Sequence, residues 1–106
     1  MTMKLRWGAA TIGAIALMLS TAGASSAGTH SVSIINCTYT GYGYSTQTTA
    51  TRSGSGCEST NARIKRVVNG SILTYDGVPG SSSVVSASNG YLYNNYHYAR
   101  TWYACT

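Results

Sequence analysis

Two Asn-Gly pairs limit the possible folds of this chain more than any other feature. Each pair is flanked by stretches in which residues alternate in polarity. Asn69-Gly70 and Asn89-Gly90 can each supply the two positive φ angles of a type I′ turn, the tight connection between neighbouring antiparallel strands. The flanking pattern repeats every two residues, which is typical of strands, and a 3.6-residue helical repeat is missing. Ser, Thr, Gly, Asn, Tyr and Val are abundant, and they favour strands and turns. The sequence therefore predicts an all-β protein.

The pattern predicts six short strands and no helix. Asn69-Gly70 joins the third strand to the fourth, Asn89-Gly90 joins the fifth to the sixth, and residues 77–80 form a turn or sheet corner. Six strands with tight turns indicate an antiparallel sandwich or small barrel that forms a single domain, residues 25–106. The expected strands cover residues 31–38, 42–52, 60–68, 71–76, 82–88 and 91–105.

The first 24 residues have the pattern of a secretory signal peptide. A positively charged start is followed by an uncharged stretch at 7–19, and Ala22-Gly23-Ala24 fits the small-residue rule for cleavage. Ser25-Ser26-Ala27 is a second candidate, so the signal peptide covers residues 1–24 or extends to 27. The uncharged stretch is shorter than the roughly 20 apolar residues that span a bilayer. We therefore expect a secreted, extracellular protein with no membrane attachment after cleavage.

Charge and size after cleavage narrow the classes of partner. Cutting after Ala24 leaves 82 residues with five cationic side chains and two carboxylates, a net charge of +3. Only Arg63, Lys65 and Arg66 cluster, whereas nucleic-acid binding requires a dense basic stripe. We interpret these three residues as a solvated strand face and exclude nucleic acid as a partner. We expect the domain to be a monomer.

Three cysteines, Cys37, Cys57 and Cys105, follow the signal segment. A domain of about 80 residues has a marginal core, and secreted domains of this size commonly add disulfides. The odd count allows one bridge and leaves one thiol, which is either buried and inert or paired between chains. The cysteines and the two histidines, His30 and His97, do not have the spacing of a zinc site. We predict no metal and no cofactor.

Catalytic groups are sparse in the part of the chain that follows the signal segment. The two carboxylates, Glu58 and Asp76, have the surroundings of loop residues rather than of a pair that faces one cleft. His30 lies close to the new N-terminus and is predicted to be disordered. His97 could activate a serine, but no serine stands in a nucleophile-elbow pattern. We therefore predict that the protein is not an enzyme.

Tyrosine is the main aromatic residue, with nine in the chain and five of them between residues 91 and 103. Strict alternation along 91–105 divides these five between two faces, so they cannot all be buried. An exposed tyrosine offers an apolar ring with a polar tip, which suits recognition. One face would hold Tyr91, Tyr93 and Tyr103, and the other Tyr96 and Tyr98.

Four short motifs occur in order along the second half of the chain: Val78-Pro79-Gly80, Asn89-Gly90-Tyr91-Leu92, His97-Tyr98-Ala99-Arg100 and Ala104-Cys105-Thr106. Upstream of them stand Cys37 and Gly56-Cys57-Glu58. This order resembles the tendamistat family, the small proteinaceous α-amylase inhibitors of Streptomyces. The family has a first cysteine, an Asn-Gly-Cys-Ala-Glu segment, a Pro-Gly corner, an Asp-Gly-Tyr turn, a His-Ala-Arg strand and a near-terminal cysteine. The resemblance covers roughly residues 36–106.

The resemblance implies a small six-stranded antiparallel β-sandwich, immunoglobulin-like or tendamistat-like, in which Cys37 is bridged to Cys57. The family has a second bridge to its near-terminal cysteine, but Thr74 stands at the position of the bridging partner in this chain. The resemblance therefore implies that Cys105 is unpaired. It also implies a domain less stable than a two-bridge relative by about 2–4 kcal/mol.

The resemblance also implies a binding site. The family inhibits through an exposed Trp-Arg-Tyr triplet between its first two cysteines, and the cation enters the acidic cleft of the amylase. The counterpart here is Tyr42-Gly43-Tyr44-Ser45, in which Gly43 replaces the arginine, and Arg52 is the only cation between Cys37 and Cys57. Because losing a central charged anchor commonly costs about 2 kcal/mol or more, we expect inhibition to be weak, retargeted or absent.

Three functions are compatible with this sequence. The first is a secreted inhibitor that binds a secreted glycoside hydrolase, α-amylase by resemblance, through Tyr42, Gly43, Tyr44 and Ser45. The second is a secreted tyrosine-rich module that binds carbohydrate or a cell surface through the strand between Tyr91 and Tyr103. The third is a bacteriocin-like secreted protein, which the mild positive charge permits without supporting it.

Overall fold

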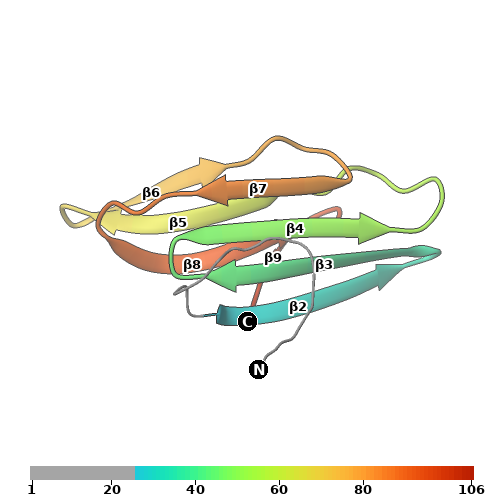
Figure 1. Cartoon of the computed structure of the whole chain (residues 1–106), viewed down its shortest axis with the longest axis horizontal. Helices are drawn as coiled ribbons and strands as arrows, with labels where there is room; N and C mark the ends of the chain where they lie inside the picture. The colour runs from blue at the N-terminus through green and yellow to red at the C-terminus, as the bar shows by residue number, and fades with distance from the viewer. Residues whose placement is uncertain (1–25) are drawn as a thin grey trace, which may run out of the picture.

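The computed structural model describes residues 26–106, which form two packed antiparallel β-sheets (Figure 1). The first sheet contains, in spatial order, β2 (Ser26–Ile34), β3 (Cys37–Tyr44), β4 (Gln47–Ser53) and β7 (Ser82–Ser86). The second contains β6 (Ser71–Asp76), β5 (Ala62–Val68), β8 (Tyr91–Tyr98) and β9 (Trp102–Ala104). The predicted signal peptide, residues 1–24, lies outside the described residues. Within residues 26–106, no helix has the length and apolar character needed to cross a membrane.

The predicted all-β sandwich is confirmed over the described residues, but it has eight strands rather than six. The expected strand 31–38 contains the turn Ile35-Asn36 between β2 and β3, and the expected strand 42–52 contains the turn Ser45-Thr46 between β3 and β4. The expected last strand breaks at residues 99–101, between β8 and β9. None of these breaks contains Gly or Pro, and Ile35 adopts φ 56°, which is rare for a β-branched residue. These breaks therefore lack the strongest local signals for a turn, although Asn36 and Ser45 are residues that turns accept.

The two Asn-Gly pairs have different roles. Asn69-Gly70 forms the predicted type I′ turn, since both residues have positive φ, 52° and 79°, and Val68 pairs with Ser71 across the turn. The same prediction is wrong for Asn89-Gly90, because β7 and β8 belong to different sheets and only Gly90 has a positive φ, 59°. A side chain at Gly90 would collide with the carbonyl group of Val67. Glycine is therefore needed here for the crossing between the sheets.

The interior between the sheets combines a small apolar cluster with many polar side chains. The buried apolar residues of the cluster are Ala50, Ala62, Ile64 and Val85. Buried polar residues are Thr48, Thr60, Arg66, Ser83, Asn95 and His97. Because a buried polar group costs free energy unless it is hydrogen-bonded, the fold depends on the partners that these side chains find.

Two glycines of β3 allow the sheets to approach where β3 packs on β8. A Cβ atom on Gly41 would lie 2.6 Å from the ring of His97, and one on Gly43 would lie 2.8 Å from Oδ1 of Asn95. Both glycines are buried. The side chains of His97 and Asn95 therefore occupy the space that side chains of β3 would otherwise fill.

The Cys37–Cys57 disulfide implied by the resemblance is confirmed, and Cys105 is unpaired and fully buried. The bridge joins the first residue of β3 to the loop after β4, with 5.8 Å between the Cα atoms. Thr74 is not placed where it could partner Cys105. Thr74 belongs to β6 at one edge of its sheet, whereas Cys105 follows β9 at the other edge. Three strand spacings make about 14 Å, and a disulfide requires Cα atoms within about 7 Å.

We expect Gly43→Ala to lower the free energy of unfolding by about 1–3 kcal/mol, because the added methyl group overpacks the contact with Asn95. Gly80→Ala is the matched control. Its Cβ atom would meet no heavy atom closer than 3.5 Å, so we expect a change below about 0.5 kcal/mol. Urea denaturation measures both variants. Equal stabilities would contradict the close packing of β3 on β8.

Candidate functional site

The four residues singled out by the resemblance, Tyr42–Ser45, lie at the end of β3 and in the turn that follows it. Tyr42 and Tyr44 are half-buried on the outer side of β3, whereas Gly43 faces the interior and is buried. Ser45 and Thr46 are both exposed and form the tip of the turn. Position 43 therefore points into the interior and not towards a partner. The most accessible part of this segment is Ser45-Thr46.

Asn95 of β8 holds this turn, which we call the β3–β4 turn (residues 44–47), from the opposite sheet. Its side-chain amide donates to the backbone oxygens of Tyr44 at 3.0 Å and Gln47 at 3.1 Å, and to Oγ1 of Thr48 at 2.8 Å. Asn95 is fully buried, so water does not compete for these bonds. Both sides of the β3–β4 turn are therefore fixed to a strand of the other sheet.

Arg66 of β5 holds the tip of the same turn. Its guanidinium donates to the backbone oxygen of Ser45 at 2.5 Å, and to those of Asn89 at 2.7 Å and Gly90 at 3.3 Å. The prediction that Arg66 lies on a solvated strand face is wrong, because this residue is only 3% exposed. Residues of β5 alternate between the two sides of the sheet, and Arg66 falls on the inner side.

Three carbonyl groups of the β3–β4 turn thus accept hydrogen bonds from buried side chains of β5 and β8. Buried and charge-assisted bonds are stronger than exposed neutral ones, so the tip is presented in one conformation. The tip offers the uncharged hydroxyl groups of Ser45 and Thr46 beside the ring of Tyr44. This arrangement suits docking against another protein and supplies no acid or base for catalysis.

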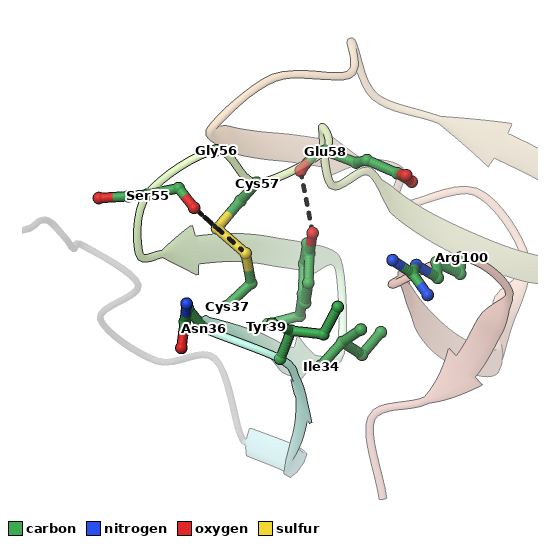
Figure 2. A pocket seen from close by; sticks show the side chains of 10 residues that line it. Ile34, Asn36, Cys37, Tyr39, Ser55, Gly56, Cys57, Glu58 and Arg100 are labelled. Atoms are coloured by element: carbon green, nitrogen blue, oxygen red, sulfur yellow. Dashed lines mark hydrogen bonds between the residues drawn. A yellow bond between two sulfur atoms is a disulfide. The ribbon is translucent and has the colours of Figure 1, made fainter.

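A small pocket lies at the other end of β3, beside the disulfide (Figure 2). The Cys37–Cys57 bridge lines it, and nearby the hydroxyl group of Tyr39 donates to the backbone oxygen of Glu58 at 3.2 Å. Arg100, from the break after β8, also lines the pocket. Its volume is about 120 Å³, below the roughly 300–1,000 Å³ of typical ligand sites. We therefore assign it no ligand.

His30 and His97 meet between the two sheets. Nδ1 of His30 in β2 lies 3.0 Å from Nε2 of His97 in β8, and the ring of Tyr103 stacks on His30 with the centroids 5.5 Å apart. The prediction that His30 is disordered is wrong, because this residue pairs with Gly41 in the β2–β3 ladder. Burial, with a smaller effect from the charge of His30, lowers the pKa of His97 to about 4. No group of three His, Cys, Asp or Glu side chains within residues 26–106 is placed to hold a metal ion.

The two carboxylates lie in different surroundings. The prediction that Asp76 is a loop residue is wrong, because it is the last residue of β6. Its carboxylate accepts hydrogen bonds from Arg63 at 2.7 and 3.0 Å. The hydrogen bond to Asp76 raises the pKa of the Arg63 guanidinium. Glu58 is exposed in the loop after β4, as the sequence predicted. Asp76 is therefore engaged in an ion pair on the outer side of β5 and β6.

We expect the free energy of unfolding to fall as the pH drops from about 6.5 to about 4. His97 takes up a proton below pH 6.5 in the unfolded chain but only below about pH 4 in the fold, so stability present above pH 6.5 is lost across this interval. The difference corresponds to about 3 kcal/mol at most. Urea denaturation at a series of pH values measures the slope. His97→Gln removes the titrating group, and an unchanged slope in this variant would show that other groups cause it.

Cys105 is expected to resist thiol reagents in the native protein. Burial raises the pKa of its thiol to about 12, which leaves almost no reactive thiolate at neutral pH. A chromogenic disulfide reagent should label no cysteine in the native protein and only Cys105 after denaturation without a reductant, because Cys37 and Cys57 are bridged. Rapid labelling of the native protein would contradict the burial of this thiol.

Among the described residues, the β3–β4 turn is the feature that best combines exposure with a fixed conformation. The pocket beside the disulfide is small, and in the histidine pair His97 is fully buried and His30 half-buried. Comparison of the chain with protein-family models, with curated proteins and with solved structures finds no match.

Proposed function

We propose that the protein is a secreted inhibitor of a glycoside hydrolase, with α-amylase as the first candidate, and that it docks the β3–β4 turn into the cleft of the enzyme. The observation that carries this proposal is the anchoring of the turn by Arg66 and Asn95. The turn also lies between Cys37 and Cys57 in the chain, where the tendamistat family carries its binding triplet. Tyr44 supplies an aromatic ring beside the exposed tip.

The anchoring supports binding because ordering a loop on association costs free energy, about 0.5–1.5 kcal/mol for each immobilised side chain. The backbone oxygens of Tyr44, Ser45 and Gln47 are already bonded in the free protein. Little further ordering of this backbone is then required when a partner binds. Protein inhibitors of proteases likewise change their interface backbone little on binding.

The chemistry of the tip predicts modest affinity for an acidic enzyme cleft. Such a cleft attracts a cation, but Ser45 and Thr46 are uncharged and Arg66 is buried beneath them. Arg52 lies towards the other end of β4, and its Nε atom is buried. Contact with the enzyme therefore depends on the hydroxyl groups of the tip and on the ring of Tyr44.

The protein is expected to slow α-amylase stoichiometrically, and Tyr44→Ala is expected to weaken this inhibition at least about tenfold, because buried aromatic anchors dominate many interfaces. Titration of bacterial, insect and mammalian amylases with a chromogenic maltooligosaccharide substrate measures both effects. Ile72→Ala, which truncates a half-exposed side chain on β6 of the other sheet, is the matched control. If micromolar protein inhibits none of the three amylases, the proposal is wrong.

Thr46→Arg is expected to strengthen inhibition at least about tenfold, because it places a cation at the tip of the β3–β4 turn. Thr38→Arg adds the same charge at the exposed start of β3 and should change the affinity less than about threefold. Inhibition constants at low and high salt measure the gain, which should shrink as salt screens the new charge. Equal effects of the two substitutions would show that the turn does not contact the cleft.

A further inference from the structure

Four aromatic side chains share the outer side of β8 and β9. We call Tyr91, Tyr96, Tyr98 and Trp102, together with Arg63 and Lys65 of β5, the aromatic face. The strand register places the rings there: Tyr91 pairs with Val67, Tyr96 with Arg63, and Tyr98 with Trp102, whereas Ala62, Ile64 and His97 between these positions are buried. The rings of Tyr98 and Trp102 meet edge to face, with their centroids 5.1 Å apart.

A β-bulge brings Tyr91 to this face. Strict alternation predicts Tyr91 and Tyr96 on opposite sides of the sheet, but the pairing shifts between Lys65 and Arg66 and leaves Tyr93 unpaired. The extra residue reverses the alternation, so Tyr91 and Tyr96 both lie on the outer side. Tyr91 is 66% exposed, and Tyr96, Tyr98 and Trp102 are half-buried. The aromatic face therefore follows the whole of β8, which spans about 25 Å at about 3.4 Å per residue.

Two cations pack against rings of the aromatic face. The guanidinium carbon of Arg63 lies 3.9 Å from the ring centroid of Trp102, and Nζ of Lys65 lies 5.3 Å from that of Tyr96. Arg63 is fixed in turn by its two hydrogen bonds to Asp76. These contacts hold the rings in place before any ligand binds, which reduces the ordering that binding would require.

We propose that the aromatic face binds a polysaccharide chain of uncharged sugars. A pyranose ring presents C–H groups on its faces and hydroxyl groups around its edge, so it can stack on an aromatic ring while its edge forms hydrogen bonds. The aromatic face supplies rings along β8 and β9, and Lys65 and the Arg63–Asp76 pair supply donors and acceptors beside them. Its length permits contact with several consecutive sugars, which favours a polymer over a single sugar.

The charges around the aromatic face favour an uncharged chain over a nucleic acid. Asp76 balances Arg63, which leaves Lys65 as the one uncompensated cation among the residues that define the face. Single-stranded nucleic acids also stack on aromatic rings, but their binding requires a basic groove that follows successive phosphates. The outer side of the other sheet has a different chemistry, since one row across its four strands consists of Ser31, Thr40, Thr51 and Ser82.

This proposal does not rest on the inhibition of a hydrolase. The β3–β4 turn belongs to one sheet and the aromatic face to the other. Tyr44→Ala alters the turn and Trp102→Ala alters the aromatic face, so each activity can be lost while the other persists. Inhibition is measured on a short soluble substrate and polysaccharide binding on an insoluble one, which keeps the two measurements independent.

Retention on insoluble cellulose, chitin and starch granules tests the proposal. We expect the protein beginning at Ser25 to be retained on at least one of them, and Trp102→Ala and Tyr96→Ala each to weaken retention at least about tenfold. Val84→Ala truncates an exposed side chain on the outer side of the other sheet and should bind like the unchanged protein. Circular dichroism and thermal melting of every variant separate a loss of binding from a loss of the fold.

Trp102 gives a site-specific signal because it is the only tryptophan after residue 7. Soluble oligosaccharides of the retained polysaccharide should change its fluorescence, and Tyr96→Ala should shift that titration to higher concentration. Three results would overturn the proposal. They are retention on none of the polysaccharides, unchanged retention in both folded variants, and binding of poly(U) with steep salt dependence in place of polysaccharide binding.

Discussion

The hydrogen bonds of Asn95 to the two sides of the β3–β4 turn are the interaction on which the rest of this structure depends. They require β8 to lie directly against β3, and that approach in turn requires a glycine at position 43. A second close approach of a β3 glycine to a β8 side chain lies two residues away, where Gly41 faces His97. At this point the sheets meet through backbone on one side and polar side chains on the other, rather than through two layers of large apolar residues as in most sandwiches.

Such a contact favours one arrangement of the sheets more than it adds stability. The buried apolar cluster contains two alanines, one isoleucine and one valine, and Tyr75, Ala87 and Leu92 pack partly buried against it, so it holds few large, fully buried apolar side chains. A buried hydrogen bond contributes only about 0.5–1.5 kcal/mol net, but a buried group without its partner is costly. Other registers of β3 on β8 would take the backbone oxygens of Tyr44 and Gln47 away from Asn95 and that of Ser45 away from Arg66, which disfavours them. The Cys37–Cys57 bridge, which closes a separation of 20 residues, adds about 3 kcal/mol in the chain-entropy model.

The parts of the fold that could be predicted are those that local chemistry decides. Asn69-Gly70 was enough to place β5 and β6, because both residues readily adopt the positive φ that the turn requires. The turn at Ser45-Thr46 was missed because its fixed partner, Asn95, lies 51 residues beyond Tyr44 in the chain. The burial of Arg66 was missed for the same reason: its acceptors lie 21 to 24 residues away, and an arginine beside other cations is normally exposed.

The geometry of β5 connects the two surfaces to which we assign binding. Lys65 and Arg66 are adjacent, so they point to opposite sides of the sheet. Lys65 reaches the ring of Tyr96 on the aromatic face, and Arg66 reaches the backbone of Ser45 beneath the β3–β4 turn. The bulge opposite these two residues then brings Tyr91 to the same side as Lys65 without moving Arg66 from the interior. The three cations that cluster in the sequence therefore lie on two sides of the sheet. Arg63 and Lys65 lie on the outer side, and Arg66 lies on the inner side, where it holds the β3–β4 turn.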